Sequence, residues 1–161
     1  MGYILKPLKI AGFILLVVTF LTISFAVDLA VRDEKSKRLY FSRISSFYMK
    51  MALAVLGVRV NVINPERLVP GRGSLLVCNH LSYIDVFAIF SNVPAVFVAN
   101  SELEEAFLLG TIIKYSGGVF VERRGRARLL QDMEGITGML DLGLNVVLFP
   151  EGTTSDGSGV S

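Results

Sequence analysis

The chain has 161 residues, a formal net charge of +2, one histidine and one cysteine, and 52% of its residues are hydrophobic. With a charge this small and no basic stripe outside the N-terminal segments, we expect no nucleic-acid partner. One cysteine excludes an internal disulfide, and one histidine with one cysteine offers no zinc-binding cluster, so we expect no metal site.

An uncharged apolar run occupies residues 10–27. It is just long enough to cross a bilayer, which takes about 20 apolar residues and at least about 17. Ser24 and Ala26 also fit the cleavage pattern of a secretory signal peptide. We favour a retained membrane segment over residues 1–31, because the segment that follows it also has an apolar face.

Residues 35–57 have the spacing of an amphipathic helix. The apolar stripe is Tyr40, Phe41, Ile44, Phe47, Tyr48, Met51 and Val55, and the polar side holds Arg38, Ser42, Arg43, Ser45, Ser46 and Lys50. A basic amphipathic helix beside a membrane segment indicates a helix lying in an anionic membrane surface. The alternative is a helix packed on the soluble part of the chain, with its charges in water.

Basic residues are more numerous after the apolar run than before it. The positive-inside rule therefore predicts a membrane protein whose remaining residues lie on the cytoplasmic face.

Residues 58–161 alternate predicted strands and helices. Val58, Val60 and Val62 alternate with polar residues, which predicts a half-buried strand. Further strands are expected at 74–78, 95–99, 119–121 and 145–149, and helices from Ser82, over 101–115 with a capping box of Ser101 and Glu104, and over 126–142. This alternation predicts an α/β fold, with a mainly parallel sheet and flanking helices. The chain stops in turn-like residues, so we expect this domain to be incomplete at its C-terminus.

The only histidine follows the strand predicted at 74–78 and precedes Asp85 by five residues. Open α/β sheets place their sites beyond the carboxyl ends of strands. On one regular helix the side chains of His80 and Asp85 would point about 140° apart. If they touch, a change in chain direction must therefore lie between them. Ser82 supplies it, because a helix is predicted to start there. In the alternative interpretation, Asp85 only stabilises the first turn of that helix, and His80 is a polar residue that caps the strand. In the functional interpretation, Asp85 orients the imidazole while its other nitrogen removes a proton from a hydroxyl.

Ser82 could instead be a nucleophile, which would make the protein a hydrolase. The flanking glycines of a nucleophile elbow are absent, since Leu81 and Tyr83 are its neighbours.

Two further motifs directly follow predicted strands. Arg123 follows the strand at 119–121, and a guanidinium group there suits a phosphate, although a solvated basic loop is the alternative that we prefer for Arg126 and Arg128. Residues 151–153 follow the last strand, where backbone amides near Gly152 could bind an anion. An ordinary exit from a strand into a turn is the alternative there.

Together these motifs resemble the glycerolipid acyltransferase family, which includes the 1-acylglycerol-3-phosphate and lysophospholipid acyltransferases. The first signature is matched by Asn79, His80 and Asp85, the second by Gly117, Phe120 and Arg123, and the third by Phe149, Pro150, Glu151, Gly152 and Thr153. The resemblance covers roughly residues 58–157, and the hydrophobic N-terminal helices are similar to the membrane-docking segment of bacterial members.

The resemblance implies an enzyme that moves a fatty acyl group from acyl-CoA or acyl-carrier protein to the free hydroxyl of a lysophospholipid, with no bound cofactor. The leading acceptor is 1-acylglycerol 3-phosphate, which gives phosphatidic acid in phospholipid biosynthesis. His80 is then the general base, Asp85 its orienting partner, and Arg123 the ligand of the acceptor phosphate. The other residues implied in substrate binding are Asn79, Gly117, Phe120, Glu151, Gly152 and Thr153.

Two positions depart from the family pattern. Thr154 stands where an arginine is common, and Asn100 where a lysine is common. Each removes a cation near the presumed phosphate site, so lyso-ornithine lipid or another lysolipid remains an alternative acceptor. A non-catalytic membrane lipid-binding module is the alternative of another class; such a module needs Arg123 but no pair of base and orienting residue.

Overall fold

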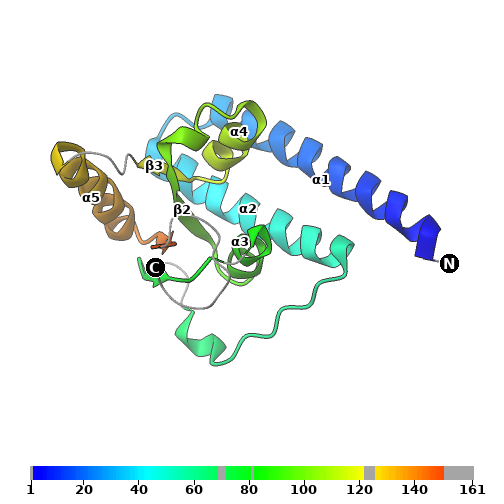
Figure 1. The fold of residues 1–161 in the computed structure, drawn as a ribbon. Coiled ribbons are helices and arrows are strands. Elements are labelled where there is room, and N and C mark those ends of the chain that lie inside the picture. Colours follow the sequence, from blue (N-terminus) through cyan, green and yellow to red (C-terminus); the bar gives the residue numbers. More distant parts are fainter. Residues whose placement is uncertain (1, 69–71, 81, 122–125, 151–161) are drawn as a thin grey trace.

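The computed structural model describes residues 2–68, 72–80, 82–121 and 126–150 (Figure 1). Two long helices come first, and strands alternate with helices after them. The elements are α1 (Gly2–Ala30), α2 (Glu34–Leu56), η1 (Pro65–Arg67), β1 (Leu75–Val77), α3 (Tyr83–Phe90), β2 (Ala95–Asn100), η2 (Ser101–Leu103), α4 (Phe107–Tyr115), β3 (Val119–Val121), α5 (Arg126–Asp141) and β4 (Asn145–Leu148). The predicted α/β class is confirmed, while the division of the chain at residues 31 and 57 stays a prediction.

The N-terminal helix α1 lies alongside α2 (Figure 1). Its residues Lys6–Ala30 have a mean hydropathy of 2.6, and only 11% of the most apolar window is buried in the protein. By length and composition α1 could therefore cross a membrane. At the end of the pair remote from the α1–α2 turn, the Lys9 ammonium group donates a hydrogen bond of 2.9 Å to the carbonyl oxygen of Leu56.

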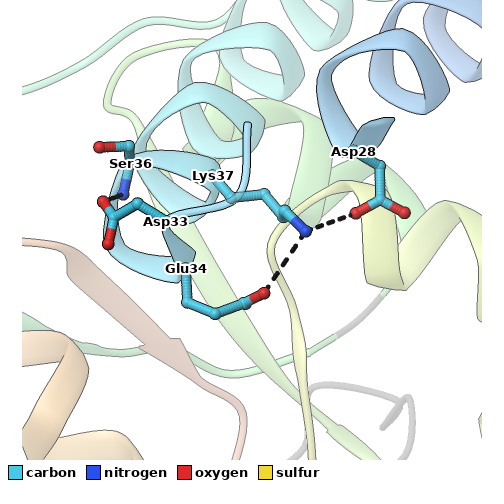
Figure 2. Close-up of polar contacts among 5 residues, drawn as sticks. All are labelled: Asp28, Asp33, Glu34, Ser36 and Lys37. Atoms are coloured by element: carbon cyan, nitrogen blue, oxygen red, sulfur yellow. Dashed lines mark hydrogen bonds and ion pairs between the residues drawn. The ribbon is translucent and has the colours of Figure 1, made fainter. Parts of the chain in front are cut away.

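An ion pair holds the turn between α1 and α2 (Figure 2). Lys37 Nζ lies 2.9 Å from Asp28 Oδ1 and 3.4 Å from Glu34 Oε1. The hydrogen bond to Asp28 is the main reason why the pKa of Lys37 is raised. Asp33 begins α2 as its N-cap, because its carboxylate accepts a hydrogen bond of 2.8 Å from the Ser36 amide.

The predicted division of α2 into an apolar and a polar side is wrong for two serines. Ser42 and Ser45 are fully buried, whereas Tyr40 and Phe47 of the apolar stripe are exposed. Serine is small enough to lie between closely packed elements, and α2 contacts α1, α3 and β2. One face of α2 therefore packs within the protein, and aromatic side chains stand on another face.

The four strands form one parallel sheet in the order β1-β4-β2-β3. Along β4, Val147 packs toward α2 and α3, whereas Val146 packs with Met139 of α5. Figure 1 shows α5 on one side of β2, with α2 and α3 on the other. Both faces of the sheet are covered, as is usual for parallel strands.

Two predicted elements differ in the structure. Residues 58–62 form no strand: Val60 and Val62 face Leu76 of β1 and Ile89 of α3 without pairing their backbone. Residues 101–115 do not form one helix, because the chain turns between η2 and α4. The Asn100 carboxamide caps η2 by accepting a hydrogen bond from the Glu102 amide at 3.3 Å, so the predicted capping box does not form there.

Asn145 joins three segments at the amino ends of the strands. Its side chain is buried, accepts a hydrogen bond of 3.1 Å from the Ser74 amide and donates one of 3.2 Å to the Pro94 carbonyl. These residues immediately precede β1 and β2, the two neighbours of β4. A single side chain therefore fixes where all three strands start.

Replacing Asn145 by leucine removes both hydrogen bonds and leaves the Ser74 amide and the Pro94 carbonyl without these partners. We expect the free energy of unfolding to fall by about 2 kcal/mol or more, measured by urea denaturation followed by circular dichroism. Asn61→Leu, at an exposed position, is the matched control and should change stability little. Equal stability of the two variants would contradict this role.

Candidate active site

The sheet register brings two of the sequence motifs together. Val77 at the end of β1 is paired with Leu148 at the end of β4. The residues that follow each strand therefore leave the sheet side by side. The His80 and Phe149 rings lie face to face at a tilt of 31°, with centroids 4.4 Å apart.

The structure also brings His80 and Asp85 together, as the sequence predicted. His80 Nδ1 lies 3.5 Å from Asp85 Oδ2, and the two side chains are 15% and 31% exposed. This distance is longer than a typical N–H···O hydrogen bond, and catalytic hydrogen bonds often tighten only when substrate is bound. Nδ1 is therefore the ring nitrogen that faces the carboxylate.

A capping box at the start of α3 fixes the Asp85 carboxylate. Asp85 Oδ2 accepts a hydrogen bond of 2.7 Å from the Ser82 amide, and Ser82 Oγ accepts one of 3.0 Å from the Ile84 amide. The structural role considered for Asp85 is therefore real, and it is compatible with the functional one because the same oxygen faces His80. The Ser82 hydroxyl is used as a helix cap, which supports its interpretation as a helix-starting residue.

His80 lines a largely apolar cavity of about 290 Å³. Its wall is built from α2, α3, β2, α4 and the residues next to them. The lining residues are Met49, His80, Tyr83, Val86, Phe87, Phe97, Val98, Ala99, Asn100, Leu103, Leu109, Ile112, Ile113, Ser116 and Phe149. Of these, Met49 and the α4 residues carry no local sequence signal for a site, because only the packing of distant segments brings them there.

The second motif begins beside β2. Gly117 is buried with φ 77°, and a Cβ at this position would lie 3.0 Å from Val96 Cγ1. Both the left-handed backbone and the close approach therefore require glycine. Phe120 is half-buried on β3 and is paired with Ala99.

The structure describes only some of the other predicted site residues. Asn79 is exposed beside His80. Asn100 at the end of β2 is paired with Val121 at the end of β3, and Arg123 follows two residues later. Arg123, Glu151, Gly152 and Thr153 lie outside the described residues, so their predicted roles stay predictions.

Residues 59–161 match the family model described as Acyltransferase. The chain belongs to this acyltransferase family. It is 34% identical over 111 residues to a 1-acyl-sn-glycerol-3-phosphate acyltransferase of Neisseria gonorrhoeae, covering 69% of this chain and 43% of that protein. It is 32% identical over 149 residues to a lyso-ornithine lipid O-acyltransferase of Rhizobium meliloti, covering 92% of this chain and 49% of that protein.

The fold is also found in a solved acyltransferase. The crystal structure of the 1-acyl-sn-glycerophosphate acyltransferase PlsC from Thermotoga maritima matches this chain with a TM-score of 0.71 and 26% sequence identity. The match covers 100% of this chain and 66% of that one. The chain thus spans about half the length of the curated acyltransferases it matches and two thirds of the solved one.

Cys78 offers a test of the site geometry that does not depend on activity. Burial raises the pKa of its thiol, and the negative charge of Asp85 raises it further. We expect alkylation of this single cysteine to be slow and to become faster in Asp85→Asn, measured as the rate of iodoacetamide labelling at pH 8.

Asp141→Asn is the matched control, since Asp141 is exposed at the end of α5, before β4 begins. It should leave the labelling rate unchanged. A rate that Asp85→Asn does not alter would show that the carboxylate does not act on Cys78 as the structure places it.

Proposed function

We propose that the chain carries the active site of an O-acyltransferase that moves a fatty acyl group from a thioester to the hydroxyl of a lysophospholipid. The observation that carries this proposal is the His80 imidazole, held 3.5 Å from the Asp85 carboxylate on the wall of an apolar cavity. A cavity of this kind accepts an acyl chain, and the imidazole is the group able to deprotonate an alcohol near neutral pH.

In the proposed reaction, Asp85 orients the His80 ring through Nδ1. The other ring nitrogen removes the proton of the acceptor hydroxyl as its oxygen attacks the thioester carbonyl carbon. The tetrahedral intermediate collapses with cleavage of the C–S bond, and the imidazolium returns the proton to the leaving thiolate. Because a thioester is already reactive, positioning and proton transfer suffice, and no acyl-enzyme is required.

The acyl donor is acyl-CoA or acyl-carrier protein, which acts as a substrate and not as a bound cofactor. The leading acceptor is 1-acylglycerol 3-phosphate, the substrate class in the name of the Neisseria relative. Arg123 is assigned to the acceptor phosphate, and Asn79, Gly117 and Phe120 to the same region. Glu151, Gly152 and Thr153 complete the proposed acceptor site.

A second acceptor, lyso-ornithine lipid, is favoured by two observations. The Rhizobium relative of that name covers 92% of this chain. Asn100 lines the His80 cavity with a neutral carboxamide whose oxygen already caps η2. A cation that would pair with a phosphate is therefore replaced at this position by a group without charge.

We place the enzyme at the membrane, with its α/β part on the cytoplasmic face. The apolar surface of α1 supports the membrane attachment, and the basic residues that follow α1 support the orientation. An acceptor dissolved in the bilayer would then reach the cavity from the membrane surface.

His80→Ala should lower the transfer rate by about 10²–10⁴-fold, the usual contribution of a general base. The measurement is the transfer of labelled acyl groups from acyl-CoA and from acyl-carrier protein in the intact enzyme, with membrane attachment unchanged. Ser82→Ala should retain transfer, because Ser82 is assigned only to the helix cap. Full activity in His80→Ala would contradict the role of His80 as the general base. Absence of transfer by the unsubstituted protein, with lysolipid binding retained, would favour the non-catalytic binding module. Loss of activity in Ser82→Ala, with release of free fatty acid by the unsubstituted enzyme, would favour a hydrolase.

Arg123→Ala should raise the acceptor KM by about 10–100-fold for 1-acylglycerol 3-phosphate, as expected for loss of a charge-assisted hydrogen bond. The KM for acyl-CoA should change little. Arg128→Ala, predicted to lie in a solvated position, is the matched control. Equal losses toward phosphorylated and unphosphorylated acceptors, measured with a lysolipid panel that includes lyso-ornithine lipid, would contradict the phosphate role.

A further inference from the structure

Three large apolar side chains stand out from η2 and the first turn of α4. Phe107 is 91% exposed, and Leu103 and Leu108 are also among the exposed hydrophobic residues. We call Leu103, Phe107 and Leu108 the α4 patch. Single exposed apolar side chains are common on soluble proteins, but an exposed cluster indicates a surface that contacts something else.

The α4 patch continues the apolar surface of α1. Leu108 lines an apolar groove of about 210 Å³ together with Phe13, Leu16 and Val17 of α1. On the other side of α1, Leu15 and Val18 are exposed. The two helices are in contact and lie near each other at the top of Figure 1. The largely apolar wall of this groove therefore joins α1 directly to Leu108 of the α4 patch.

The α4 patch also borders the His80 cavity. Leu103 lines this cavity and is partly exposed, and Tyr83, which lines it from α3, is largely exposed. The patch thus lies between the rim of the cavity and the helix assigned to the membrane.

We propose that the α4 patch inserts into lipid beside α1, on the side of the membrane that the α/β part faces, and is a second membrane contact at the rim of the His80 cavity. Its role rests on the proposed function, since an acceptor lying in the bilayer would enter between the two contacts without crossing water. Continuity with α1 is the argument for lipid as the occupant.

The charges beside the patch agree with this choice. Glu102, Glu104 and Glu105 are exposed in the segment just before Phe107. They would repel an anionic partner, whether protein or lipid. In a zwitterionic bilayer their carboxylates can stay in the headgroup layer while the apolar side chains enter the acyl chains.

The chain has no tryptophan, so one introduced residue reports its own surroundings. We would compare Phe107→Trp with Leu15→Trp on α1 and with Ile63→Trp. Ile63 is 80% exposed and lies in the connection between α2 and η1. The measurement is tryptophan emission, corrected for the unsubstituted protein, with phosphatidylcholine vesicles that carry brominated acyl chains.

The proposal expects a blue shift and strong quenching at positions 107 and 15, with neither at position 63. Quenching at position 15 but not at 107 overturns the α4 contact and leaves the α1 contact standing. Absence of quenching at both positions overturns both contacts. Equal quenching at position 63 also overturns the proposal, because the contact would then not be specific to this face.

A kinetic comparison separates this inference from the proposed function. Phe107→Ser should raise the KM for a long-chain lysolipid in vesicles several-fold without changing kcat, and should not affect a short-chain lysolipid dissolved as monomers. Ile63→Ser should change neither value. If the protein transfers no acyl group but the quenching pattern holds, the proposed function fails and the α4 contact stands. An unchanged KM in Phe107→Ser counts against the α4 contact.

Discussion

The parallel pairing of β1 with β4 is the constraint on which the rest of the site depends. These strands are about 70 residues apart in the chain, yet β4 lies between β1 and β2. Their register places the His80 ring against Phe149 at the carboxyl ends of the strands, and Asn145 fixes the register at the amino ends. Any shift of β4 along β1 would move the two motifs apart by at least one residue step of about 3.3 Å, which is more than a catalytic contact tolerates.

Asp85 makes two interactions with a single oxygen atom. One carboxylate oxygen accepts the hydrogen bond that begins α3 and also faces His80. An exposed aspartate would lose side-chain freedom each time it approached the imidazole. Here that freedom is already lost in forming the helix cap, so the orientation of the carboxylate is fixed before substrate arrives. The structural role of this residue and its proposed catalytic role therefore use the same geometry.

Much of this arrangement could be predicted from local sequence, and the failures have physical reasons. Asp85 and Ser82 lie three residues apart, so their capping box is a local pattern, and the parallel sheet follows from alternating strands and helices. The sequence pattern assigns Ser42 and Ser45 to the polar side because their side chains are polar, whereas packing selects them for small size. The break between η2 and α4 has no local signal, because α4 begins after Ala106 without a side-chain cap. Met49 enters the cavity wall only through tertiary packing, so no motif could reveal it.

The helix pair formed by α1 and α2 is more than an anchor. Met49 of α2 belongs both to the core cluster around Phe149 and to the wall of the His80 cavity. A Cβ at Gly117, in the second motif, would lie 3.6 Å from Phe41 Cβ of α2. Removing the first 57 residues to obtain a water-soluble protein would therefore also disturb the α/β part. It would remove Met49 from the wall of the His80 cavity and Phe41 from behind Gly117, so solubility is better sought by replacing outward-facing residues of α1 while the helix itself is kept.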